Sequence, residues 1–176
     1  MPGRQGKTGR RDGSFDAFEL AARGGTLEGT VDVADLQRAA DSLAPGDGRV
    51  AWRIAGSADP VGRPALEVAL TGTVPLECRR CLESFAWPVA QRTLLLLARD
   101  EGELARLDEG DEHEVVLAAA ALEAAALVED ELLLSLPFAP CCDRAACAGE
   151  AAAAPAPVAS AFGALAALKR GPKPGR

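Results

Sequence analysis

Five cysteines are the residues of this chain whose type and spacing are best suited to chemistry. Cys78 and Cys81 stand two residues apart, with an apolar, β-prone run before them and a second β-prone run after them. Two thiols at this C-x-x-C spacing can point toward one spot, as a metal ion or a redox disulfide requires. The other three follow about sixty residues later, at positions Cys141, Cys142 and Cys147.

The first prediction from these residues is a structural zinc site. Zinc takes four tetrahedral Cys or His ligands, and the chain offers a four-thiolate set of Cys78, Cys81, Cys142 and Cys147. Arg79 and Arg80 would offset the two net negative charges of such a site. By sequence alone, Cys141 is as good a candidate ligand as Cys142. The C-x4-C spacing of Cys142 and Cys147 is wider than that of the usual second ligand pair of a zinc site. The alternative is that the cysteines are reduced, unligated and packed as small apolar groups.

A second interpretation is a thiol–disulfide redox protein that uses Cys78 and Cys81. Motifs of that kind usually open a helix after a strand, because the helix N-terminus lowers the pKa of the attacking thiol. Here Pro88 and the alternation of large apolar residues after the second cysteine indicate a strand instead. The predicted strand argues against such an enzyme, and the redox protein is the alternative function.

The elements that must position these cysteines are predicted strands. Alternating apolar and polar residues predict a short strand over 26–33 and a half-buried strand over 49–56. After a turn at Asp59-Pro60, the alternation resumes through Leu66, Val68 and Leu70 toward the cysteine turn, and residues 84–98 form a returning strand.

The predicted helices complete an α+β fold. Residues 16–22 and 35–43 are short helix candidates, and the acid-rich stretch 99–114 is expected to be a solvated loop. Residues 117–136 predict the longest helix, rich in Ala, Leu and Glu. We expect an antiparallel sheet of about four to five strands with this long helix packed on it, and disordered basic termini.

Glu129 has an unusual position on the long predicted helix. At a hundred degrees per residue it falls within the apolar arc, whereas Glu123, Asp130 and Glu131 fall on the other side. A carboxylate in an apolar arc needs a cation or several hydrogen-bond donors, or it takes up a proton. The alternative is an irregular helix end that lets Glu129 reach water.

Composition divides the chain into four predicted parts. Residues 1–13 predict a disordered basic leader, 14–147 a single α+β domain, 148–160 an Ala/Pro linker, and 161–176 a short amphipathic segment with a basic tail. No secretory signal and no stretch long enough to span a membrane is visible. Together with an odd number of cysteines, this predicts a reducing compartment and a cytoplasmic protein.

Charge is distributed unevenly along the chain. The net charge is −7, but residues 1–11 and 169–176 hold eight of the 19 bases and no acid. Residues 12–168 contain the other eleven bases and all 26 acids, so their net charge is −15. Such a body repels phosphate overall, and any contact with RNA would need the tails or a local basic patch. The candidate residues for a patch that binds RNA or a partner are Arg49, Arg53, Arg79 and Arg80.

Several motifs, in the right order over about residues 15–170, resemble one family. They are Cys-Arg-Arg-Cys-Leu-Glu at 78–83, Val-Glu-Asp-Glu-Leu-Leu-Leu-Ser-Leu-Pro at 128–137 and Ala-Phe-Gly-Ala-Leu-Ala-Ala-Leu-Lys-Arg at 161–170. The chain resembles the YceD-type family, the large ribosomal RNA subunit accumulation proteins. Many relatives have a histidine where this chain has Cys142, and either side chain can bind zinc.

The resemblance implies a non-enzymatic factor in large ribosomal subunit biogenesis, with no known catalytic residue. Such a factor supports synthesis, processing or stability of 23S ribosomal RNA. The expected partner is 23S ribosomal RNA or a large-subunit precursor, contacted directly or through a ribosomal protein, and no membrane. Only seven aromatic residues are present, most at apolar-face positions, so we do not expect a base-stacking platform.

Overall fold

A computed structural model describes residues 13–109, 113–144 and 147 of the 176-residue chain. The helices and strands of these described residues belong to the compact unit Met1–Cys141. The expected linker at 148–160, the tail at 161–176 and all but the last residue of the leader lie outside the described residues. The predicted domain limits therefore stay a prediction.

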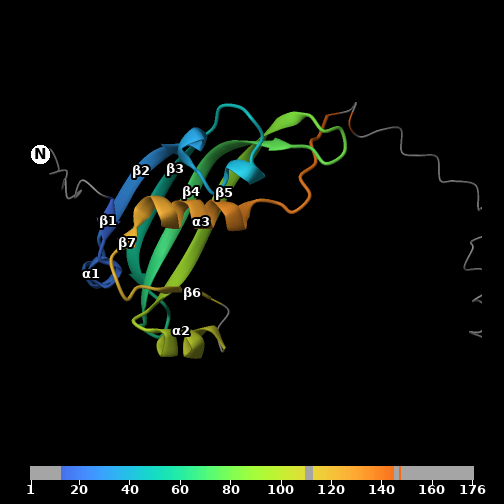
Figure 1. Cartoon of the computed structure of the whole chain (residues 1–176). Coiled ribbons are helices and arrows are strands. Elements are labelled where there is room, and N and C mark those ends of the chain that lie inside the picture. The colour runs from blue at the N-terminus through green and yellow to red at the C-terminus, as the bar shows by residue number, and fades with distance from the viewer. Residues whose placement is uncertain (1–12, 110–112, 145–146, 148–176) are drawn as a thin grey trace, which may run out of the picture. The chain divides into compact units, whose positions relative to one another are not determined.

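The fold is built on a five-stranded sheet with the order β2-β3-β4-β5-β6 (Figure 1). Neighbouring strands are antiparallel from β2 to β5, whereas the edge strand β6 runs parallel to β5. The expected α+β class is confirmed, with a mostly antiparallel sheet. The strands are β2 (Thr26–Asp32), β3 (Arg49–Ala58), β4 (Pro64–Glu77), β5 (Ser84–Ala98) and β6 (Glu114–Leu117).

Strands β4 and β5 form a long hairpin that carries the first two cysteines at its tip. Their register runs from Ala65 opposite Leu96 to Glu77 opposite Ser84. Alternate residues of these strands point to the same face of the sheet, and on the inner face they are apolar and buried. Val68, Leu70, Val74, Leu76, Val89, Leu95 and Leu97 make up this part of the core.

Helix α3 (Ala124–Ser135) lies across the inner face and packs on β4 and β5 (Figure 1). Its buried side chains Leu127, Val128 and Leu132 join the core of the sheet. Burial of such side chains is the main favourable term in folding, because each removes apolar surface from water. The helix therefore sets where the chain leaves the sheet, just before the second group of cysteines.

The helix predicted over residues 117–136 begins later than expected, so that prediction was wrong at its start. Its first residue, Leu117, is the last residue of β6, and Leu122–Glu123 forms β7, which pairs antiparallel with β1 (Ser14–Phe15). Between them, the Ala118 N–H donates to the Ala98 carbonyl at 2.7 Å. Pairing with distant strands outweighs the high helix propensity of this alanine-rich stretch.

The helix predicted over residues 35–43 was also wrong. Its first residue ends the 3₁₀ turn Val33–Asp35, and only one further 3₁₀ turn, Ala40–Ser42, lies within it. The backbone N–H groups of Arg38 and Ala39 donate to the Glu129 carboxylate. An α-helix would need these same groups to bond carbonyls four residues earlier, so the contact with Glu129 replaces the helix.

The stretch expected to be a solvated loop, residues 99–114, contains helix α2 (Glu101–Asp108). The Asp100 side chain caps it by accepting from the Glu103 N–H at 2.8 Å, an N-cap arrangement that favours helix initiation. The helix predicted near the N-terminus is confirmed as α1 (Ala17–Arg23). It ends at Gly24, whose φ of 57° suits glycine.

No helix of the described residues is both long and apolar enough to cross a membrane.

Candidate metal centre

The tip of the β4–β5 hairpin is a tight turn that places Cys78 and Cys81 close together. The Cys78 N–H donates to the Glu83 carbonyl at 3.0 Å, and the Leu82 N–H donates to the Cys78 carbonyl at 2.9 Å. These bonds close the turn directly after the last pair of the hairpin ladder. Because β4 and β5 hold the base of the turn, the two thiols have little freedom to separate.

A further hydrogen bond ties this turn to the segment that follows α3. The Arg79 N–H donates to the Pro140 carbonyl at 2.8 Å. Proline at positions 137 and 140 restricts the backbone of that segment, since the ring fixes φ. Cys142 lies two residues after Pro140, so the chain is guided back to the turn before the second cysteine pair begins.

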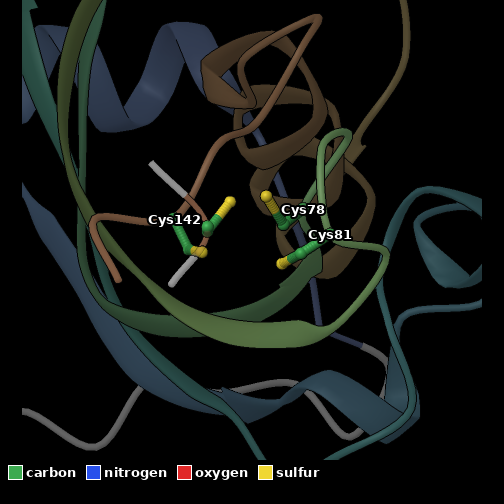
Figure 2. A group of neighbouring side chains, drawn as sticks. Cys78, Cys81 and Cys142 are labelled. Carbon is green, nitrogen blue, oxygen red and sulfur yellow. The ribbon is translucent and has the colours of Figure 1, made fainter. Parts of the chain in front are cut away.

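Four of the five cysteines form one cluster. The sulfur atoms of Cys78, Cys81, Cys142 and Cys147 all lie within 4.8 Å of one another. Figure 2 shows the side chains of Cys78 and Cys81, on the hairpin turn, facing that of Cys142 across a small space. Tetrahedral zinc with ligands at about 2.3 Å would place its sulfurs about 3.8 Å apart, which is compatible with this limit. The cluster can hold a metal ion.

The environment of the cluster favours a buried structural site. Cys78 and Cys142 are buried, whereas Cys81 and Cys147 are half-buried. The Arg80 N–H donates to the Cys78 sulfur at 3.5 Å, a type of contact that stabilises thiolate charge around metal sites.

The structure separates Cys141 from Cys142, which the sequence could not do. Cys141 is exposed and lies outside the cluster, whereas Cys142 is buried within it. Consecutive residues of an extended chain point in opposite directions, so only one of the two can face the hairpin turn. Which of the two cysteines faces the turn depends on the path of the chain after α3, and the local sequence does not determine this path.

The hairpin turn does not have the arrangement of a thiol–disulfide enzyme. Cys81 is followed by β5, and no described helix begins at the turn, whereas the reactive cysteine of such an enzyme usually stands at a helix N-terminus. Cys78 is fully buried, which restricts attack on a substrate disulfide.

Glu129 is buried on α3 and has several hydrogen-bond donors. One carboxylate oxygen accepts from the N–H groups of Arg38 and Ala39, at 2.6 and 2.9 Å. The other accepts from the Arg38 Nε at 3.0 Å. Of the two alternatives drawn from the sequence, the structure shows a carboxylate satisfied by donors rather than one that reaches water. The partner segment lies about ninety residues away in sequence.

The four candidate arginines lie on two separate surfaces. Arg49 and Arg53 are exposed on one face of β3, and Arg49 donates to Asp32 on β2 at 2.7 Å. Arg79 and Arg80 are exposed on the hairpin turn. Arg49 is opposite Thr73, six residues before Arg79, which is about 20 Å along a strand. Their predicted role in binding stays a prediction.

Comparison with known proteins supports the resemblance drawn from the sequence motifs. No curated protein and no solved structure matched the chain. The family described as large ribosomal RNA subunit accumulation protein YceD matches residues 66–169, which begin in β4 and include all five cysteines. The match covers 104 of 176 residues, more than half of the chain. The chain therefore belongs to the YceD family of large ribosomal RNA subunit accumulation proteins.

Proposed function

We propose that this protein is a non-enzymatic factor in large ribosomal subunit biogenesis that supports synthesis, processing or stability of 23S ribosomal RNA. The observation that carries this proposal is the family match over residues 66–169, whose description names large-subunit ribosomal RNA accumulation. The cysteine cluster fits a structural role better than a catalytic one, because half of its thiols are buried and the turn lacks an activating helix.

We further propose that the cluster binds one zinc ion, held by Cys78, Cys81, Cys142 and Cys147. Four thiols within 4.8 Å of one another match the ligand type and number of a closed structural zinc site. A bound zinc ion supplies positive charge that keeps all four sulfurs as thiolates. The chain itself contributes the hairpin turn, the hydrogen bond from Arg79 to Pro140 and the Arg80 N–H aimed at the Cys78 sulfur.

Two neighbouring cysteines provide a matched test of the zinc proposal. Protein purified under reducing conditions, without chelator, should contain about one zinc per chain by elemental analysis. Cys142→Ser should lower this content well below one, whereas Cys141→Ser should leave it unchanged, because Cys141 is exposed outside the cluster. Equal zinc content in both variants, or little zinc in the fresh wild-type protein, would contradict the proposal.

The biological role is tested by deleting the gene from its natural host. The ratio of mature 23S to 16S ribosomal RNA should fall in the deletion strain and should be restored by the wild-type gene. A catalytically dead enzyme added back at the same level, such as an unrelated hydrolase variant, serves as the expression control. An unchanged ratio in the deletion strain would remove the proposed role and leave the fold and the cysteine cluster standing.

A further inference from the structure

Leu82 on the cysteine turn has both a conformation and an exposure that are unfavourable for leucine. Its φ is 59°, in the left-handed region that favours glycine or asparagine. Its side chain is 68% exposed. A single exposed leucine needs no explanation. Here, however, glycine would adopt the left-handed conformation without strain, and the exposed leucine side chain adds little apolar burial to the fold. Residues that break local rules in this way are expected at functional or strained sites.

Phe138 is a second exposed apolar side chain on the segment that contacts this turn. It is 101% exposed, and Leu134, in the last turn of α3, is 67% exposed. Phe138 precedes Pro140 by two residues, and Leu82 follows Arg79 by three. The Arg79 N–H donates to the Pro140 carbonyl. Leu82 and Phe138 are therefore each separated from this hydrogen bond by at most three residues, or about 11 Å of fully extended chain.

We propose that Leu82 and Phe138 are the anchors of a docking surface for a basic protein. Leucine and phenylalanine can fill apolar pockets of a partner, and the turn and the proline-flanked segment hold them in place before binding. Residues 12–168 carry a net charge of −15, which attracts a basic partner. In combination with the proposed function, on which this step depends, the partner is a basic protein of the large ribosomal subunit.

RNA fits this surface less well than protein does. Arg79 and Arg80 on the turn are balanced by Glu77 and Glu83, which are exposed at its two ends. Binding of a phosphate backbone needs an excess of positive charge that the turn does not present. Leu82 cannot stack on a base as an aromatic ring does.

The test compares two anchor variants with a distant control in the full-length, zinc-loaded protein. Leu82→Gly and Phe138→Ala remove the anchors, whereas Val61→Ser removes an apolar side chain that is 77% exposed at the opposite end of β4. The probes are RNA-free protein extracted from purified large subunits, with captured proteins identified by mass spectrometry, and protein-free 23S ribosomal RNA. Affinity is then measured with the captured protein after its purification.

Each anchor variant should bind the captured protein at least about tenfold more weakly, and Val61→Ser should bind like the wild type. Leu82→Gly separates binding from folding, because glycine relieves the left-handed conformation and its melting temperature should be no lower than that of the wild type. Wild-type binding to no large-subunit protein, unchanged affinity in both variants, or a loss confined to RNA binding would each overturn the docking surface.

Failure of the docking surface and failure of the proposed function give different results. If the deletion strain has a normal ratio of 23S to 16S ribosomal RNA, the proposed function is wrong whatever the variants bind. If the ratio falls on deletion but the Leu82→Gly, Phe138→Ala double variant restores it fully and keeps wild-type affinity, only the docking surface is wrong.

Discussion

Glu129 stabilises the fold because it is charged. Burial by itself would raise the pKa of this carboxyl, but hydrogen bonds from Ala39 and Arg38 outweigh it and hold the pKa below its ordinary value. The unfolded chain therefore binds the proton more readily than the folded one. This contribution is complete above the ordinary pKa of a glutamate and is lost as the pH falls through the folded-state pKa.

Glu129→Gln should lower the free energy of unfolding at pH 7 by about 1–3 kcal/mol, because the amide leaves the donors of Arg38 and Ala39 without a charged acceptor. Urea unfolding at pH 7 and at successively lower pH measures the effect. The difference from the wild type should shrink on acidification. Glu123→Gln, at the exposed N-cap position of α3 where the side chain makes no capping hydrogen bond, is the control. A difference that stays constant into the acid range would contradict the argument.

Glu131 has the opposite property. It is only 3% exposed, and burial raises the pKa of its carboxyl. A hydrogen bond with Thr93 on β5 acts against this shift, whereas the nearby charges of Glu114 and Asp130 add to it. The folded chain here binds the proton more readily than the unfolded one. Stability from this group therefore falls as the pH rises from the ordinary pKa toward the folded-state pKa.

Glu131→Gln should leave stability at pH 7 unchanged or raise it by up to about 1 kcal/mol, because glutamine removes a buried charge that faces two like charges. The same urea titrations measure it, and the advantage over the wild type should be smaller in acid than at pH 7. A clear destabilisation at pH 7 would show that the hydrogen bond with Thr93 outweighs the cost of the buried charge, contrary to this prediction.

These two glutamates show what helical periodicity can predict for single residues. The apolar arc correctly included Glu129, but its partner Arg38 is far away in sequence and follows only from tertiary packing. The same arc placed Glu131 on the outer side, which was wrong. Helix α3 is covered by the sheet and also by the segment around Leu36 and Ala39, so its buried arc is wider than one apolar stripe.

At the scale of elements, strands were easier to predict than helices in this chain. Residues 84–98 were expected as one strand and form β5 with the same limits, because alternation and the cysteine turn mark both ends. The start of α3 and the parallel strand β6 could not be predicted, since both depend on pairing with β1 and β5. The cysteine cluster was anticipated as a set, but the selection of Cys142 over Cys141 required the path of the chain after α3.

Metal removal should loosen the tip of the β4–β5 hairpin before the rest of the sheet. Chelation should lower the melting temperature and increase amide exchange at Cys78, Arg79 and Leu82, whose N–H groups bond within the turn or to Pro140. Hydrogen exchange with mass spectrometry measures this, and amides of β2 and β3 provide the internal control. Equal acceleration in all strands would mean that the cluster supports the whole domain rather than the tip.

At the scale of the whole molecule, charge separates the body from its two ends. The acidic body favours basic partners and repels phosphate, so the basic ends hold most of the positive charge that a contact with RNA would need. The two effects respond differently to salt. Phosphate contacts release counterions and weaken steeply with salt, whereas a contact that depends on apolar anchors is less affected.

Removal of residues 1–11 and 170–176 leaves the family-matched region 66–169 intact and takes away seven bases, which changes the net charge from −7 to −14. The truncated protein should lose most of its affinity for bare 23S ribosomal RNA at low salt, because the repelling body then has no basic ends to oppose it. Affinity for a basic large-subunit protein should change little, since the acidic body and the Leu82 and Phe138 side chains remain. Salt titrations of both complexes measure the two effects. RNA affinity that survives the truncation would mean that the body itself holds phosphate, most simply through the arginines of β3 or of the cysteine turn.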